Sequence, residues 1–173
     1  MAADRIRLRP LRSSDAPLLY EWITDRGLVI LNSAYYPVSE QDHEAWVSSM
    51  MRRHSDRVFF VIEEVETGAA IGSCQLLNID ARHRHAELQI RIGDARGRGK
   101  GLGSEAVEHL CRFGFRDLNL HRIQLEVFAT NVAAVKAYEK CAFKHEGRLR
   151  EAAFIDGAWV DILVMARLAE SQP

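Results

Sequence analysis

The chain has 173 residues, the size of one domain, and we expect a single domain over residues 1–173. Its 47% hydrophobic and 27% charged residues are typical of a soluble globular protein, and its formal net charge of −1 argues against a general nucleic-acid binder. The sequence has neither the ~18-residue apolar run of a membrane span nor an N-terminal signal core. Three dispersed cysteines without a C-x-x-C pair indicate reduced thiols. We therefore expect a cytoplasmic protein without membrane or nucleic-acid partners.

Apolar periodicity and turn residues predict alternating strands and helices along the whole chain. In chain order we expect a strand at 5–9, a helix from Ser14 to Gly27, an aromatic-rich loop at 28–38, a helix from Ser39 to about His54, strands at 58–64, 70–78 and 85–92, a helix at 101–118, a strand at 122–128, a helix at 131–141, and strands at 143–150 and 159–167. Three successive strands indicate an antiparallel half, whereas the strand–helix–strand run at 85–128 indicates a parallel crossover. This order predicts an α/β (α+β) fold with a mixed, mostly antiparallel sheet of about seven strands and helices on both faces.

A glycine-rich segment, ARGRGKGLG at residues 95–103, lies between a predicted strand and a predicted helix. Each glycine costs about 1 kcal/mol relative to alanine in a helix, so the cluster indicates a sharp turn or a close approach to a ligand. The helix that follows offers free N–H groups and a partial positive charge at its start. Arg96, Arg98 and Lys100 add positive charge. The segment predicts a phosphate or pyrophosphate site, and the alternative is a flexible turn with solvated cations.

Two common phosphate-binding patterns fit this segment poorly. The P-loop fails because Gly93 is one residue too far away and Gly101 follows the lysine in place of Ser or Thr. The dinucleotide pattern G-x-G-x-x-G/A is formally met by Gly101, Gly103 and Ala106, with Glu126 at the end of the next strand. That pattern usually opens a domain of successive parallel units, whereas here it follows antiparallel strands. A nucleotide-dependent oxidoreductase therefore remains an alternative interpretation.

A third pattern, [QR]-x-x-G-x-[GA], is matched by Arg96, Gly99 and Gly101. Downstream, NVAAVKAYEKCAF at 131–143 is similar to N-x-x-A-x-x-x-Y-[ER]-K-x-G-F, with Ala142 in place of the usual glycine. On these motifs the chain resembles the GNAT N-acetyltransferase superfamily. Its closing stretch, EGRLREAAFIDGAWVDILVMARL, and its N-terminal strand and helix resemble the ribosomal-protein-alanine (RimJ/RimL-like) branch. The resemblance covers nearly the whole chain.

The resemblance implies a GNAT-like fold and an enzyme that moves an acetyl group from acetyl-CoA directly to a primary amine, on a protein N-terminus or a small molecule. The strand before the loop is expected to splay from its neighbour, so that the pantetheine arm pairs with the main chain of 89–92. Loop N–H groups would bind the pyrophosphate. Asn131 would hydrogen-bond the arm, act as a helix N-cap, or do both. The residues implied to bind the coenzyme are Ile90, Ile92, Arg96, Gly97, Arg98, Gly99, Lys100, Gly101, Leu102, Gly103, Ser104 and Asn131.

Catalytic roles fall by resemblance on Tyr138 and Glu87. Tyr138 follows Asn131 by seven residues, nearly two helical turns, so both project from one face. Tyr138 would protonate the departing thiolate, or else it is a packed aromatic. Glu87 would accept the amine proton directly or through water, or else it is a solvent-facing strand carboxylate. His83 and His85 form an H-x-H pair without a third ligand, leaving a substrate-side base as an alternative; we expect no metal.

The acceptor site is expected near the loop at 31–38 and the final hairpin, with Tyr35, Tyr36 and Trp159 as substrate-binding residues; the alternative for these aromatics is packing at the edge of the core. The acceptor could be a ribosomal protein N-terminus, an amino sugar, a polyamine or an aminoglycoside. A CoA-binding sensor without catalysis and an RNA-contacting module are the non-enzymatic alternatives. A homodimer would be unsurprising for this branch.

Overall fold

The computed structural model describes residues 4–170, without the side chain of Arg96. Its elements follow the predicted order. They are β1 (Ile6–Pro10), η1 (Ser13–Asp15), α1 (Ala16–Thr24), α2 (Arg26–Val29), α3 (Glu40–Met50), β2 (Val58–Glu64), β3 (Ala70–Asp80), β4 (His85–Ile92), η2 (Ala95–Gly97), α4 (Leu102–Arg116), β5 (Arg122–Phe128), α5 (Val132–Lys140), β6 (Lys144–Ile155) and β7 (Ala158–Leu168). No helix of this part of the chain is long and apolar enough to cross a membrane.

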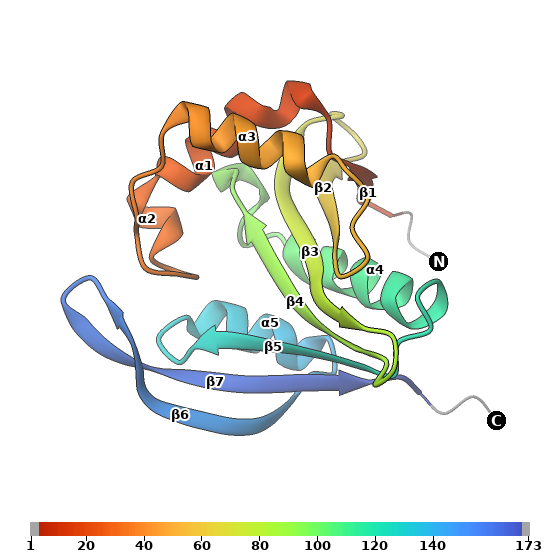
Figure 1. Cartoon of the computed structure of the whole chain (residues 1–173). Helices are drawn as coiled ribbons and strands as arrows, with labels where there is room; N and C mark the ends of the chain where they lie inside the picture. The colour runs from red at the N-terminus through yellow and green to blue at the C-terminus, as the bar shows by residue number, and fades with distance from the viewer. Residues whose placement is uncertain (1–3, 171–173) are drawn as a thin grey trace.

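The strands form one seven-stranded sheet in the order β1-β2-β3-β4-β5-β7-β6 (Figure 1). Of the neighbouring pairs described, β4 and β5 run parallel and the other five run antiparallel. The crossover between β4 and β5 contains α4, as the sequence predicts. This mixed sheet confirms the predicted fold class. It also removes the doubly wound sheet that a dinucleotide-binding domain would require.

Two neighbouring phenylalanines of β2 show that helices cover both faces of the sheet. Phe59 contacts Trp46 of α3 edge-on, with ring centroids 5.5 Å apart, and Phe60 contacts Phe113 of α4 in the same way at 5.2 Å. Because successive side chains of a strand point to opposite faces, α3 and α4 lie on opposite sides. The α4 side holds the larger core, which includes Leu88, Leu110, Ile123 and other buried apolar side chains.

The predicted boundaries differ from the structure in three places. The first helix, α1, ends at Thr24 and not at Gly27. Gly27 lies instead in the short helix α2, which runs into the segment from residue 28 that was expected to be a loop. The third helix ends at Met50, short of His54. The strands of the closing hairpin are longer than predicted, because β6 runs to Ile155 and β7 begins at Ala158, on either side of the expected turn Asp156-Gly157. The longer hairpin strands follow from tertiary pairing, which extends strands beyond their apolar pattern.

Candidate active site

The sheet is forked between β4 and β5. Their parallel pairing covers only His85–Glu87 against Arg122–Gln124, although β4 continues to Ile92. On its other side β4 stays paired with β3 up to Ile92 opposite Gly72. The splay expected from the resemblance is therefore present, and it begins directly after Glu87. Beyond this point one edge of β4 is available for an extended ligand that adds to the sheet.

A cavity of about 350 Å³ occupies this fork. It is lined by side chains from both faces of the sheet, since Glu87, Gln89 and Arg91 alternate with Leu88 and Ile90 along β4. Helices α1 and α3 contribute aromatic and apolar groups, and α5 with its N-cap residue contributes further lining. These additional lining residues include Leu19, Trp22, Ile23, Trp46, Asn131, Ala134 and Tyr138. The cavity therefore joins the two sides of the sheet at the place where β4 and β5 part.

Glu87 lies at the apex of the fork, opposite Gln124 of β5. Its Oε2 accepts a hydrogen bond from Asn78 Nδ2 at 3.3 Å, and its Oε1 accepts one from Gln89 Nε2 at 3.2 Å. These two amides fix the orientation of the carboxylate while leaving it at the cavity wall. A carboxylate in this position can accept a proton from an amine that enters the cavity.

Tyr138 also lines the cavity, from α5. It is 8% exposed and packs against Phe143, with ring centroids 5.9 Å apart. Burial, with a smaller contribution from Cys141, raises the pKa of Tyr138 to about 12. The phenol is therefore protonated at every ordinary pH and can donate a proton. Burial likewise raises the pKa of Cys141 to about 11, so this thiol is not an activated nucleophile.

Asn131 caps α5, as one of its two expected roles requires. Its Oδ1 accepts a hydrogen bond from Ala134 N at 3.2 Å, and its Nδ2 donates to the carbonyl of Leu31 at 3.1 Å. The cap satisfies one of the N–H groups that the first turn of a helix leaves free. Asn131 also lines the cavity, so it connects the start of α5 to the fork.

The glycine-rich loop turns sharply into α4. Gly99 and Gly101 adopt φ of +73° and +79°, a conformation that strongly favours glycine. The first hydrogen bond of α4 runs from Glu105 N to Gly101 O, so the N–H groups of 102–104 have no acceptor within the helix. Gly97 and Gly103 bring the loop against Ile92, because a Cβ at either position would meet its side chain at 3.1 and 3.4 Å. Loop donors and the β4 edge are thus adjacent, as a ligand with a diphosphate and an extended arm requires.

Two cations of the loop, Arg98 and Lys100, have described side chains. Arg98 points back to the strand, since its Nη2 donates to the carbonyl of Gly93 at 2.9 Å and its Nε to that of Ile92 at 3.3 Å. Lys100 is exposed, and its carbonyl accepts a hydrogen bond from Arg5 Nη1. The prediction for the side chain of Arg96 lies outside the described residues. The main chain of the loop, more than its cations, therefore provides the described anion-binding groups.

The three aromatics predicted to bind the acceptor do not line the cavity. Tyr36 and Trp159 are 80% and 63% exposed, and Trp159 packs on Phe154 of the same hairpin with ring centroids 5.1 Å apart. Tyr35 lies under the guanidinium of Arg26 at 5.3 Å. The cavity wall contains instead Trp22, Trp46 and Arg91, which sequence reasoning did not single out as site residues. The polar phase of the strand at 85–92, which contains both Glu87 and Arg91, is the pattern that could have identified Arg91.

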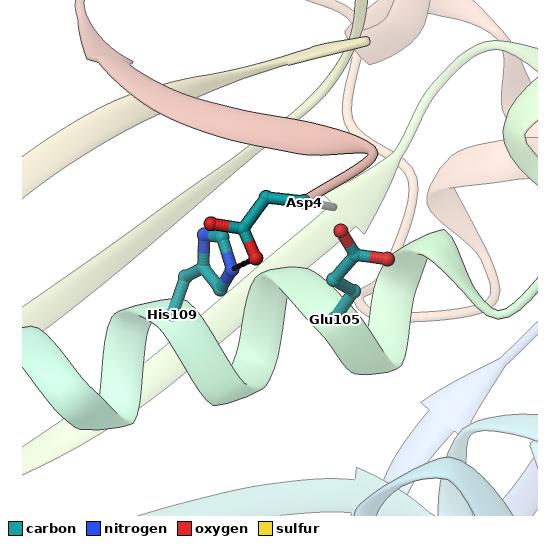
Figure 2. Close-up of side chains that lie close together, drawn as sticks. All are labelled: Asp4, Glu105 and His109. Carbon is teal, nitrogen blue, oxygen red and sulfur yellow. Dashed lines mark ion pairs between the residues drawn. The ribbon is translucent and has the colours of Figure 1, made fainter. Parts of the chain in front are cut away.

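One group of possible metal ligands occurs in the described part of the chain, and it is remote from the cavity lining. Figure 2 shows Asp4 paired with His109 Nε2 at 3.4 Å, with Glu105 beside them on α4. Both oxygens of Glu105 already accept hydrogen bonds from Arg5, at 2.6 Å from its N and 2.9 Å from its Nε. This cluster fastens the N-terminal segment to α4. His83 and His85 stack with ring centroids 6.3 Å apart and do not line the cavity.

The comparisons with known proteins agree with this geometry. The family model of the acetyltransferase (GNAT) domain matches residues 5–144. The spermidine N(1)-acetyltransferase of Escherichia coli K12 is 32% identical over 171 residues, which cover 95% of this chain and 86% of that protein. The enzyme of the same name from Vibrio cholerae is 39% identical over 103 residues, covering 60% of this chain and 58% of that one. A crystal structure of Vibrio cholerae spermidine N-acetyltransferase with CoA and spermine superposes with a TM-score of 0.88 at 30% identity, covering 96% of each chain. The expected ribosomal-protein-alanine branch is therefore not supported.

Proposed function

Since this chain belongs to the GNAT acetyltransferase family and is an N-acetyltransferase, we propose that it transfers the acetyl group of acetyl-CoA directly to a primary amine of a small molecule. The fork between β4 and β5, with Glu87 at its apex, is the observation that carries this proposal. The names of the relatives support a small amine over the protein N-terminus that the sequence left open. Spermidine is accordingly the reference acceptor for any test.

The proposal assigns a role to the start of α4, to the edge of β4, to Glu87 and to Tyr138. Bound acetyl-CoA would supply the acetyl thioester. Main-chain N–H groups at the start of α4 would hold the diphosphate, and the part of β4 that no longer pairs with β5 would align the arm. The amine nitrogen forms a bond to the acetyl carbon as the carbon–sulfur bond breaks. Glu87 takes the proton that the amine loses, directly or through water, and Tyr138 gives a proton to the departing thiolate.

The pKa of the amine determines how much free energy its deprotonation costs, and therefore how much the reaction depends on Glu87. An alkyl amine with a pKa near 10.4 is neutral in about 1 part in 2,500 at pH 7, which costs ~4–5 kcal/mol. Deprotonating an α-amine with a pKa near 7.8 costs about 1 kcal/mol at pH 7. The base at the apex of the fork is therefore more important for an alkyl amine than for an amino-terminal one.

Free-thiol release from acetyl-CoA tests the proposal. The acceptors are spermidine, spermine, short monoamines, amino acids and a peptide with an amino-terminal alanine. The three cysteines of the chain are 1–2% exposed, so a thiol reagent has little background from the folded enzyme. We expect turnover with small amines that exceeds turnover with the peptide. A preference for the peptide, or CoA binding without thiol release from any acceptor, would overturn the proposal.

A further inference from the structure

Arg91 is a cation of the cavity wall. It is partly buried, and its Nε is shielded from solvent with no hydrogen-bond acceptor. None of its other side-chain atoms makes a hydrogen bond or ion pair with residues 4–170. Burial alone lowers the pKa of Arg91 from its usual value, without compensation from a nearby carboxylate. Arg98, by contrast, donates hydrogen bonds from its guanidinium to the carbonyls of Ile92 and Gly93 at the end of β4.

A shielded guanidinium without a counter-ion lowers the stability of the protein unless a ligand supplies the missing negative charge. A guanidinium remains protonated in a protein, and a shielded charge without a counter-ion is destabilising. The carboxylates of the wall do not provide the counter-ion: Glu87 is held by Asn78 and Gln89, and within residues 4–170 Glu126 makes no ion pair or hydrogen bond with Arg91. Glu87 and Arg91 are four residues apart on one strand, which places their Cα atoms about 13 Å apart. Arg91 is therefore separate from the base at the apex.

The side chain of Arg91 faces away from the loop that is proposed to hold the diphosphate. Gly97 and Gly103 of that loop lie against Ile92, the next residue of β4. Since successive side chains alternate between the faces of a sheet, Arg91 projects to the opposite face. Its cross-strand neighbour there is Ser73, which also lines the cavity. This is the face that α3 covers through Trp46 and Phe59.

We infer that Arg91 binds a carboxylate of the acceptor, so that the preferred acceptor is a small molecule with a primary amine at one end and a carboxylate at the other. This inference rests on the proposed function and narrows its substrate class. A guanidinium offers two parallel N–H donors that match the two oxygens of a carboxylate. The amine reaches Glu87 while the carboxylate reaches Arg91. A polyamine, which carries a further positive charge in place of the carboxylate, is repelled by Arg91.

The test compares ω-amino acids of two to six carbons with n-alkylamines of the same length and with spermidine, by thiol release. For the wild-type enzyme we expect kcat/KM at least 10-fold higher for the best ω-amino acid than for its alkylamine. Arg91→Gln should lower kcat/KM for the amino acid 10-fold or more, chiefly through KM, and leave the alkylamine unchanged. Arg91→Lys should keep part of the preference. Arg57→Gln is the control, since the Nε of Arg57 is also shielded without a hydrogen-bond partner, whereas its Nη2 pairs with Asp56 Oδ2 at 3.4 Å and Arg57 does not line the cavity.

The outcomes separate this inference from the proposed function. Efficient acetylation of alkylamines or spermidine, with no preference for carboxylated acceptors, would overturn the role of Arg91 and leave the small-amine acetyltransferase intact. No thiol release with any amine would overturn the proposed function itself. An Arg91→Gln variant that binds CoA more weakly and loses activity equally with all acceptors would assign Arg91 to the coenzyme. If Arg91→Gln does not fold, the comparison of ω-amino acids with alkylamines on the wild-type enzyme still tests the inference.

Discussion

The side-chain amide of Asn32 donates a hydrogen bond to the main-chain carbonyl of Ile90, with 3.3 Å between Nδ2 and the oxygen. Ile90 lies in the part of β4 that no longer pairs with β5. Asn131 on the other side of the fork donates to the carbonyl of Leu31 at 3.1 Å. The segment at 31–32 therefore connects the two sides of the fork: the side chain of Asn32 contacts β4, and the carbonyl of Leu31 contacts the N-cap of α5. In the proposed complex the arm of the coenzyme competes with Asn32 for the Ile90 carbonyl.

Removing this competition should strengthen coenzyme binding. We expect Asn32→Ala to bind CoA about 2–10-fold more tightly, because a side-chain hydrogen bond of this kind contributes roughly 0.5–1.5 kcal/mol net. Isothermal titration calorimetry with CoA measures the change. Ser33→Ala, at the next position of the cavity wall, should leave the affinity unaltered. Weaker binding by Asn32→Ala would show that Asn32 contacts the coenzyme instead of competing with it.

The base at the apex of the fork should control the pH dependence. Glu87→Gln keeps the shape of the side chain but cannot take a proton. We expect kcat/KM for spermidine or an ω-amino acid to fall 10²-fold or more, and to fall most at low pH, where the amine is almost entirely protonated. Stopped-flow or thiol-release rates between pH 6 and pH 9 give the profile. A variant whose pH–rate profile matches the wild type would remove Glu87 from the mechanism.

Tyr138→Phe tests the proton donor with little change in packing. The described residues give its hydroxyl no hydrogen-bond partner, so we expect a melting temperature close to that of the wild type. We expect kcat to fall about 10²–10⁴-fold, with KM for acetyl-CoA little changed. Because burial raises the pKa of Tyr138 to about 12, the wild-type rate should not fall through loss of this proton below about pH 11. An unchanged kcat would assign Tyr138 to packing against Phe143.

The loop should need glycine at residue 101 for binding as well as for folding. Gly101 and Gly68 have similar positive φ values, +79° and +69°, so alanine at either position should lower the free energy of unfolding by roughly 1–2 kcal/mol. Only Gly101 lies at the start of α4, where it orients the N–H groups proposed to bind the diphosphate. We expect Gly101→Ala to weaken CoA binding 10-fold or more and Gly68→Ala to leave it unchanged. Equal affinities in titration calorimetry would contradict the proposed diphosphate site.

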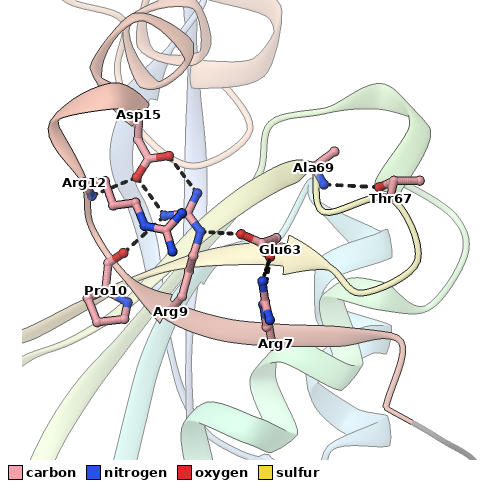
Figure 3. A network of polar contacts seen from close by, with 8 residues as sticks. All are labelled: Arg7, Arg9, Pro10, Arg12, Asp15, Glu63, Thr67 and Ala69. Atoms are coloured by element: carbon pink, nitrogen blue, oxygen red, sulfur yellow. Dashed lines mark hydrogen bonds and ion pairs between the residues drawn. The ribbon is translucent and has the colours of Figure 1, made fainter.

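A buried ion-pair network should make stability depend on acid pH. Figure 3 shows Arg9 between Asp15 and Glu63; Arg9 Nη2 is 2.7 Å from Asp15 Oδ1 and Arg9 Nε is 2.5 Å from Glu63 Oε2. Burial, the largest single cause, acts to raise the pKa of both carboxyls. The hydrogen bonds and charge of Arg9, together with those of Arg12 at Asp15 and of Arg7 at Glu63, outweigh it and leave each pKa below its usual value. Their contribution to stability is therefore complete above about pH 4–5, the ordinary range of these groups, and is lost as pH falls through the lowered values.

Asp15→Asn should lower the free energy of unfolding by about 3–5 kcal/mol at pH 7, since it leaves Arg9 without one of its buried counter-ions. The difference from the wild type should shrink as pH falls below 4. Urea denaturation at pH 7 and pH 3 measures both values. Asp156→Asn removes an exposed ion pair with Arg26 and should change stability by no more than ~1 kcal/mol. A pH-independent loss in Asp15→Asn would contradict this account.

The sequence by itself determined most of the elements and the family. Alternation along His85–Ile92, the glycines at 99 and 101 and the Asn131–Tyr138 spacing are local patterns, and each appears in the structure as predicted. Local patterns succeed here because strand and helix periodicity depends on residues within a few positions of one another. No such pattern supported the residues expected to bind the acceptor: Tyr35, Tyr36 and Trp159 were chosen by their position in the chain, and they do not line the cavity.

Only the tertiary structure decided where the sheet forks and what lines the fork. The end of the β4–β5 pairing after Glu87 depends on strands 37 positions apart in sequence, His85 and Arg122. Whether Arg91 has a counter-ion depends on every element around it, and no spacing in the sequence carries that information. Charge pairing and cavity shape depend on distances in space, so the class of acceptor can be inferred only from the tertiary structure.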